Sequence, residues 1–208
     1  MTVIKDEYNG QHSDSREGLV DAWTRNGRVF IANEPAVSTP ETMSATGTAL
    51  TLTDPSIRFT VPAGVLVVPI HVQLAVVTVA AKDDIFAVIA TASDSYASGG
   101  DAVPMLVKNA IINGTSEARA TTLTNIHYSD TSIVEGALIA PRVLKYQESQ
   151  PPATAQSWNP EYNILKGDPM VYLTGPASFL VVAVQETAPA EATFNLSWAE
   201  LNINEFTP

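Results

Sequence analysis

Three histidines, His12, His71 and His127, are the only imidazole side chains with which this chain could build a hydrolytic triad or a histidine-ligated metal site. His71 lies within a run of alternating apolar residues, on the polar side of that run, so we expect it to be a surface or interface residue. His127 is close in sequence to Ser129 and Asp130, but triad members are recognised by their geometry in space and not by adjacency. We therefore expect no catalytic role for the histidines.

Two pairs of acidic residues could in principle act as catalytic carboxylates or as calcium ligands. Asp83 and Asp84 are the obvious candidates for a glycosidase-type carboxylate pair, but consecutive strand residues point to opposite faces and cannot flank one glycosidic bond. Asp94 and Asp101 frame a loop rich in Ser and Gly, where carboxylates and carbonyls could hold calcium. That loop lacks the regular spacing of a calcium-binding loop, which disfavours calcium binding there, and Asp83 and Asp84 are interpreted as a polar turn.

Other chemical motifs are absent from the sequence. The chain has no cysteine, which excludes disulfides, thiolate zinc sites, iron–sulfur clusters and cysteine nucleophiles. It has no phosphate-cradling Gly-rich loop, no Gly-x-Ser-x-Gly nucleophile elbow and no pair of metal-binding histidines at helical spacing. We predict that the protein is not an enzyme and that it has no catalytic, cofactor-binding or metal-binding residues.

The composition restricts the partners. Charged residues make up 16% of the 208 residues, against about 25% in an average soluble domain, which suits a chain that covers part of its surface with a partner. The formal net charge is −11 and the basic residues are scattered singly, so we expect binding neither to nucleic acid nor to an anionic membrane surface. The longest apolar run, residues 65 to 81, is interrupted by Pro69, His71 and Gln73 and is no transmembrane helix. The first residues carry no secretory signal pattern, so we expect synthesis in a host cytoplasm.

Period-two alternation dominates the chain from Thr46 onward. Ile57, Phe59 and Val61 alternate with polar residues, and the next run, residues 65 to 80, has apolar residues at its even positions from 66 to 76. This pattern predicts that the even positions face the core and that the odd positions, with His71 and Gln73, meet solvent or a neighbouring molecule.

Further strands are predicted along the rest of the chain, and no segment shows a long helical pattern. Near Ala199 the apolar parity of the last strand shifts, which predicts a β-bulge or a strand end. The pattern favours an all-β fold, an antiparallel jelly-roll-like β-sandwich formed by residues 43–208. The further predicted strands are residues 85–92, 105–112, 121–128, 141–147, 170–174, 179–186 and 193–203.

Residues 1–42 are polar and interrupted by Gly and Pro, which is typical of an N-terminal arm. A short helix is possible after Asp14, which has Glu17 three residues later, and Leu19 and Trp23 would share one face of it. Residues 28–32 could form a small strand. Since large apolar side chains are unusual in a disordered tail, they are interface candidates together with the odd face of the long strand. The interface candidates are Trp23, Phe30, Ile31, His71 and Gln73.

The long connection from 148 to 167 contains three prolines and is predicted to wrap around the outside of the sandwich. Aromatic residues on polar loops could stack on a ligand, because loops at one end of a sandwich readily form binding sites. Tyr96, Trp158 and Tyr162 are the candidates for such ligand-binding loops.

Three runs resemble the jelly-roll structural proteins of viruses, above all the capsid-decoration, cement and head-spike proteins of bacteriophages. They are residues 50–64 (LTLTDPSIRFTVPAG), residues 179–184 (FLVVAV) and residues 194–201 (FNLSWAEL). The resemblance implies a homo-oligomer, with a trimer favoured, on the outer capsid surface of a virion, where the terminal arm reaches a neighbour and the major capsid protein is a partner. The arm contains both acidic and basic residues, which favours an outward-facing position over one that faces a genome.

Three functional hypotheses follow. The first is an accessory capsid protein of the decoration or cement type, which stabilises a particle by bridging subunits. The second is a receptor- or glycan-binding module of a spike or head fibre. The third, which the small histidine inventory disfavours, is a jelly-roll enzyme.

Overall fold

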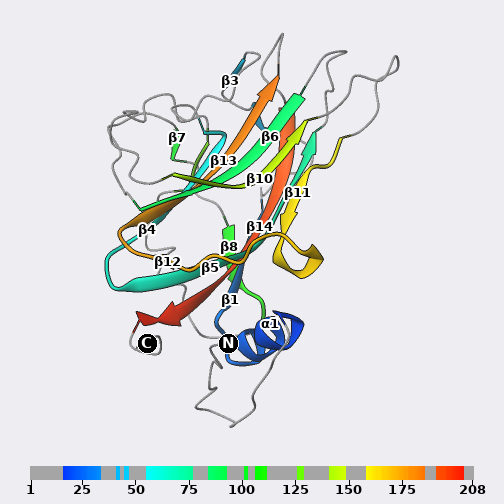
Figure 1. The fold of residues 1–208 in the computed structure, drawn as a ribbon. Helices are drawn as coiled ribbons and strands as arrows, with labels where there is room; N and C mark the ends of the chain where they lie inside the picture. The colour runs from blue at the N-terminus through cyan, green and yellow to red at the C-terminus, as the bar shows by residue number, and fades with distance from the viewer. Residues whose placement is uncertain are drawn as a thin grey trace.

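A computed structural model describes residues 16–33, 41–42, 45–46, 55–76, 84–92, 101–102, 106–111, 126–128, 141–148, 158–185 and 191–203. In this part of the chain two β-sheets pack on one another, and one α-helix lies beside them (Figure 1). Nearly all strand pairs are antiparallel, so the predicted all-β antiparallel sandwich is confirmed. The jelly-roll connection order stays a prediction.

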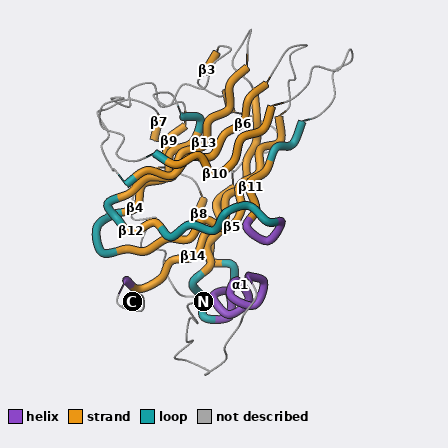
Figure 2. The backbone as a smooth tube through the Cα atoms, viewed as in Figure 1, coloured by secondary structure: helices purple, strands orange, loops and turns teal. Residues whose placement is uncertain are grey.

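Sheet A runs across five strands in the order β11-β5-β14-β1-β8, with two short strands, β2 and β12, paired at its sides. The longest strands, β5 and β14, are neighbours in its middle (Figure 2). The strands of sheet A are β1 (Val29–Asn33), β2 (Glu41–Thr42), β5 (Val65–Val76), β8 (Leu106–Asn109), β11 (Glu161–Asn163), β12 (Leu173–Thr174) and β14 (Glu191–Asn202).

Sheet B runs in the order β10-β6-β13-β4-β9-β7, and β3 pairs with β13 in parallel. The strands predicted at 85–92, 141–147 and 179–186 are found in this sheet with similar bounds. Its strands are β3 (Ala45–Thr46), β4 (Ile57–Val61), β6 (Asp84–Thr91), β7 (Asp101–Ala102), β9 (Ile126–Tyr128), β10 (Arg142–Glu148) and β13 (Ala177–Gln185).

Aromatic side chains join the two sheets. The Trp198 ring on β14 lies with its centroid 5.0 Å from that of Phe59 on β4 and 6.1 Å from that of Phe30 on β1. A second inter-sheet contact joins Tyr162 on β11 to Phe179 on β13, with centroids 5.7 Å apart. These side chains fill the space between the sheets, where rings of this size contribute most to apolar burial.

The predicted core face of β5 is only partly correct, because the pairing of β5 with β14 shifts by one residue. Ser197 pairs with His71 and Trp198 pairs with Pro69, which leaves Ile70 as an extra residue. Since paired residues share a face and neighbours alternate, the even positions from 70 to 76 lie on the core side, as predicted. The pairing of β14 with β5 therefore contains the bulge that was expected near Ala199, but the extra residue lies on β5 and not on β14.

On the N-terminal side of the bulge the odd positions of β5, and not the even ones, face the core. The prediction that Leu66 and Val68 face the core is therefore wrong. They pair with Leu201 and Ala199, on the face of sheet A opposite to Trp198. All four of these side chains are buried, as is the whole first half of β5, so both faces are covered there. An apolar run that is covered on both sides carries no alternation from which its parity could be deduced.

The assignment of residues 16–33 to an arm is wrong, because they belong to the folded body. The predicted helix is present as α1 (Arg16–Arg25), and β1 follows it at the expected place. However, β1 lies inside sheet A between β14 and β8, and α1 packs against β1 and β14. Residues 1–15 and 34–40 lie outside the described residues.

Just before β4, a side-chain hydroxyl forms the hydrogen bonds that a strand backbone would otherwise form. Pro55 has no N–H group, and the hydroxyl of the next residue, Ser56, takes the place of a strand residue. Its Oγ accepts a hydrogen bond from the N–H of Ala183 at 3.0 Å and donates one to the carbonyl oxygen of Ala183 at 3.2 Å. Ser56 is fully buried, so no water could replace it.

We predict that Ser56→Ala lowers the free energy of unfolding by about 1–3 kcal/mol, because it leaves two buried backbone groups of Ala183 without a partner. Denaturant unfolding would measure the change. Ser197→Ala, on a partly exposed position of β14, is the matched control and should change the free energy by less than about 0.5 kcal/mol. Equal effects of the two substitutions would contradict this account of Ser56.

Gly175 lies where two backbone segments approach closely. A Cβ atom at this position would lie 1.7 Å from the carbonyl oxygen of Pro62, so the backbone would have to move. We predict that Gly175→Ala destabilises the protein by about 2 kcal/mol or more. Gly64→Ala, where the φ of +82° is unfavourable but no atom lies within 4 Å, should cost only about 1 kcal/mol in the same unfolding measurement. A smaller loss at Gly175 than at Gly64 would contradict this prediction.

Candidate functional site

The face of sheet A that points away from sheet B is a polar surface formed by several paired strands. We call it the outer face. Strand pairing aligns the side chains in its central part in two rows across the sheet, and they alternate with buried residues such as Phe30, Leu196 and Val72. The first row is Lys108, Ile31, Ser197, His71 and Asn163, and the second is Asn33, Asn195, Gln73 and Glu161.

Three of the five predicted interface residues meet on this outer face. Ile31 pairs with Ser197, which pairs with His71, and Gln73 follows in the next row. All of these side chains are partly exposed. The structure thus brings Ile31 close to two residues that lie 40 or more positions further along the sequence.

The other two interface candidates, Trp23 and Phe30, are placed in the interior. Trp23 is 5% exposed and Phe30 is 3% exposed, and both belong to the hydrophobic core. Their prediction as surface interface residues is wrong in this conformation, because α1 and β1 use their apolar sides to close the sandwich. The unusual apolar residues of the expected arm are explained by this packing.

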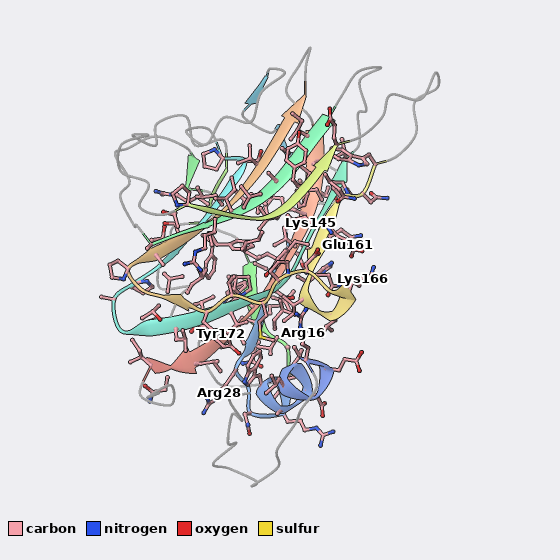
Figure 3. All side chains as sticks on the ribbon, in the orientation of Figure 1. Arg16, Arg28, Lys145, Glu161, Lys166 and Tyr172 are labelled. Atoms are coloured by element: carbon pink, nitrogen blue, oxygen red, sulfur yellow. The ribbon has the colours of Figure 1, made fainter. Side chains whose placement is uncertain are left out.

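A charged cluster lies at the β11 end of the outer face. Glu161 forms an ion pair with Lys166, in the 3-10 helix η3 (Ile164–Lys166), and Nε2 of His71 lies 3.4 Å from Oε2 of Glu161. Glu161 and Lys166 lie beside one another in Figure 3. The hydrogen bond from Lys166 lowers the pKa of Glu161 despite some desolvation, and His71 lowers it further. Glu161 is therefore an anion at neutral pH.

The pKa of His71 is lowered below its ordinary value of 6.5. Partial burial is the largest cause, since it disfavours the charged imidazolium, while Glu161 acts in the opposite direction and Lys166 adds a smaller lowering. His71 is thus neutral at pH 7. Of the described side chains in the two rows and on η3, only Lys108, Glu161 and Lys166 are charged at that pH, so the outer face carries little net charge.

Two of the three predicted ligand-binding aromatic residues, Tyr162 and Trp158, lie in the described part of the chain. Tyr162 is fully buried in the core, and its hydroxyl donates to the carbonyl oxygen of Pro169 at 2.7 Å, so the prediction that it contacts a ligand is wrong. Burial is also the main reason that the pKa of Tyr162 is raised. Trp158 forms a bridge with Val76 and packs against the core, partly exposed. Tyr96 lies outside the described residues.

Sequence analysis missed a polar junction centred on Asp168. One carboxylate oxygen accepts from Nζ of Lys145 on β10 at 2.7 Å, and the other accepts from the backbone N–H of Asn163 at 2.8 Å. Arg16 of α1 donates to the carbonyl oxygens of Asp168 and Ile164 at 2.7 and 2.8 Å. This junction ties sheet B, β11 and α1 together, and only the local capping pattern of Asn163 and Gly167 around η3 is visible in the sequence.

The histidines and acidic residues that could act as catalytic groups or metal ligands either lie apart from one another or lie outside the described part of the chain. Within the described ranges no three His, Asp or Glu side chains lie close enough to hold a metal ion. His12, Asp83 and Asp94 lie outside those ranges, as do the side chains of His127 and Asp101. No helix in the described part of the chain is long and apolar enough to cross a membrane.

No protein family, curated protein or solved structure matches this chain. Its function has to be inferred from the chemistry of its own surfaces, among which the outer face of sheet A has the best-defined geometry.

The lowered pKa of His71 leads to a pH prediction. The unfolded chain takes up the proton first as pH falls below 6.5, so the free energy of unfolding should decrease from there down to the lower pKa of the folded state. We predict that His71→Gln removes this part of the decrease below pH 6.5. Denaturant unfolding at several pH values would measure it. His12 and His127 are present in both proteins and cancel in the comparison, and an unchanged pH slope in the variant would contradict the prediction.

Proposed function

We propose that this chain is a virion structural protein, of the accessory type that decorates or cements a capsid, and that it bridges subunits on the outer capsid surface. The observation that carries the proposal is the outer face of sheet A, which is broad and nearly neutral although the chain has a net charge of −11. A protein-binding surface has few charges in its centre, where desolvation would be costly. Neutral amide and hydroxyl groups can be desolvated at lower cost when they find partners.

Three further properties support a structural role. The sandwich has a continuous core between its sheets, so the outer face rests on a rigid support. The net negative charge disfavours contact with nucleic acid and suits a position outside a packaged genome. The resemblance of residues 50–64, 179–184 and 194–201 to phage decoration and cement proteins agrees with both properties.

The receptor- or glycan-binding alternative loses Tyr162, one of the three aromatic residues that favoured it. Sugar rings are commonly recognised by exposed aromatic faces, but Tyr162 is buried and Trp158 packs against the core. In the two rows of the outer face no described side chain is aromatic. We therefore do not propose a glycan-binding function.

The proposal predicts that the purified protein binds to capsids of its own virus prepared without it, and that it raises their thermal stability by several degrees. Co-sedimentation would measure binding, and genome release during heating, followed with a DNA dye, would measure stability. Gln73→Arg places a charge in the middle of the outer face. It should raise the protein concentration that is needed to stabilise the capsids at least about ten-fold. Val143→Arg, at a position of β10 that is 56% exposed, adds the same charge to sheet B and should behave as the unmodified protein.

Capsids that neither bind the unmodified protein nor gain stability from it would refute the proposed function. An equal loss of stabilisation in the two arginine variants would show that added positive charge, and not the outer face, determines the effect.

A further inference from the structure

We propose that two copies of this chain associate through the outer face of sheet A, about a two-fold axis that runs parallel to β14. This inference rests on the same surface as the proposed function and deepens it by naming the occupant of that surface as a second copy of the chain. On a capsid, copies bound to neighbouring subunits would bridge those subunits by associating with one another through this face.

The strand order provides the symmetry. β14 is the middle strand of the five, with β1 and β8 on one side and β5 and β11 on the other. A half-turn about an axis parallel to β14 lays β1 of one copy over β5 of the other and β8 over β11. Two sheets that pack face to face with nearly aligned strands are a common arrangement, with crossing angles of about 30°. The surface is therefore used identically by both copies, as closed dimers require.

The side chains that this half-turn brings opposite one another are chemically compatible. Asn195 and Ser197 lie on β14 near the axis, so each would face its own counterpart, and Asn33 would face Gln73. Amide and hydroxyl groups both donate and accept hydrogen bonds, so identical groups can pair. Ile31 of one copy would lie against His71 of the other, which is neutral at pH 7 and tolerates an apolar neighbour.

Charge also favours this face over the rest of the surface. Two copies of a chain with a net charge of −11 repel one another, and the repulsion is smallest where the local charge is not negative. The outer face contains Lys108 at its β8 end, and Glu161 with Lys166 at its β11 end. The half-turn places Lys108 of each copy opposite Asn163 of the other copy, beside Glu161, whose negative charge is balanced by Lys166.

The size of the face sets the expected affinity. Five strands about 4.8 Å apart and two rows about 7 Å apart give roughly 400 Å² per copy, about half of what a standard stable interface buries on each partner. Association should therefore be weak, with a Kd of tens of micromolar or higher. Such a contact would be populated mainly where copies are concentrated, as on a particle surface.

The position of Asn195 near the axis allows a decisive test with the full chain and no capsid. Sedimentation equilibrium from about 5 to 500 µM should show a monomer–dimer equilibrium for the unmodified protein. Asn195→Arg should abolish it, since two arginines would face each other, and Asn195→Asp should abolish it in the same way. An equimolar mixture of the two variants should dimerise again, at least as strongly as the unmodified protein, because arginine then faces aspartate.

Val143→Arg on sheet B is the control and should dimerise as the unmodified protein does. If either Asn195 variant fails to fold, judged by thermal unfolding, the pair Ser197→Arg and Ser197→Asp makes the same test. The inference is overturned if the unmodified protein stays monomeric at all concentrations, if the single variants still dimerise, if the mixture associates no better than its components, or if the assembly is a trimer. Failure of the capsid-binding experiment would refute the proposed function without affecting this result.

Discussion

The rest of the structure depends on the burial of Trp198 between the two sheets. Its ring contacts Phe59 from sheet B and Phe30 from β1, and its indole N–H donates to Oε1 of the buried Glu200 at 3.1 Å. A large ring with a satisfied polar group fixes which face of β14 points inward. Because side chains alternate along a strand, Asn195 and Ser197 must then point outward. The outer face is thus a direct consequence of the core.

The sequence was most informative where one side of a strand is buried and the other is not. The second half of β5 shows this alternation, with Val72 and Leu74 inside and His71 and Gln73 outside, and it was predicted correctly. The first half of β5 is buried on both sides, and the extra residue Ile70 reverses the parity there. A bulge leaves no mark in a run of apolar residues, because every position satisfies either parity.

The N-terminal region and the candidate site show a different limit. Helix α1 and strand β1 could be predicted from local pattern, but their insertion against β14 depends on residues about 170 positions away. Likewise Ile31, His71 and Gln73 could each be identified as outward residues, whereas their alignment into rows requires the strand register. The Asp168 junction and the burial of Tyr162 also arise from tertiary packing. Within the connection 148–167, which was expected to wrap around the outside, Glu161–Asn163 pairs with β5 as an edge strand.

The central position of β14 also affects how the chain can fold during synthesis. β14 spans Glu191–Asn202 and pairs with both β5 and β1, so it is the strand that joins the two halves of sheet A. Until a ribosome has released these residues, β1 and β5 each lack the same neighbour and Phe59 has no Trp198 to pack on. Such long-range pairing is slow and leaves apolar strand edges exposed, which favours aggregation of incomplete chains. Sheet A therefore cannot complete its pairing until β14 has left the ribosome, and up to that point β1 and β5 each keep an unpaired edge.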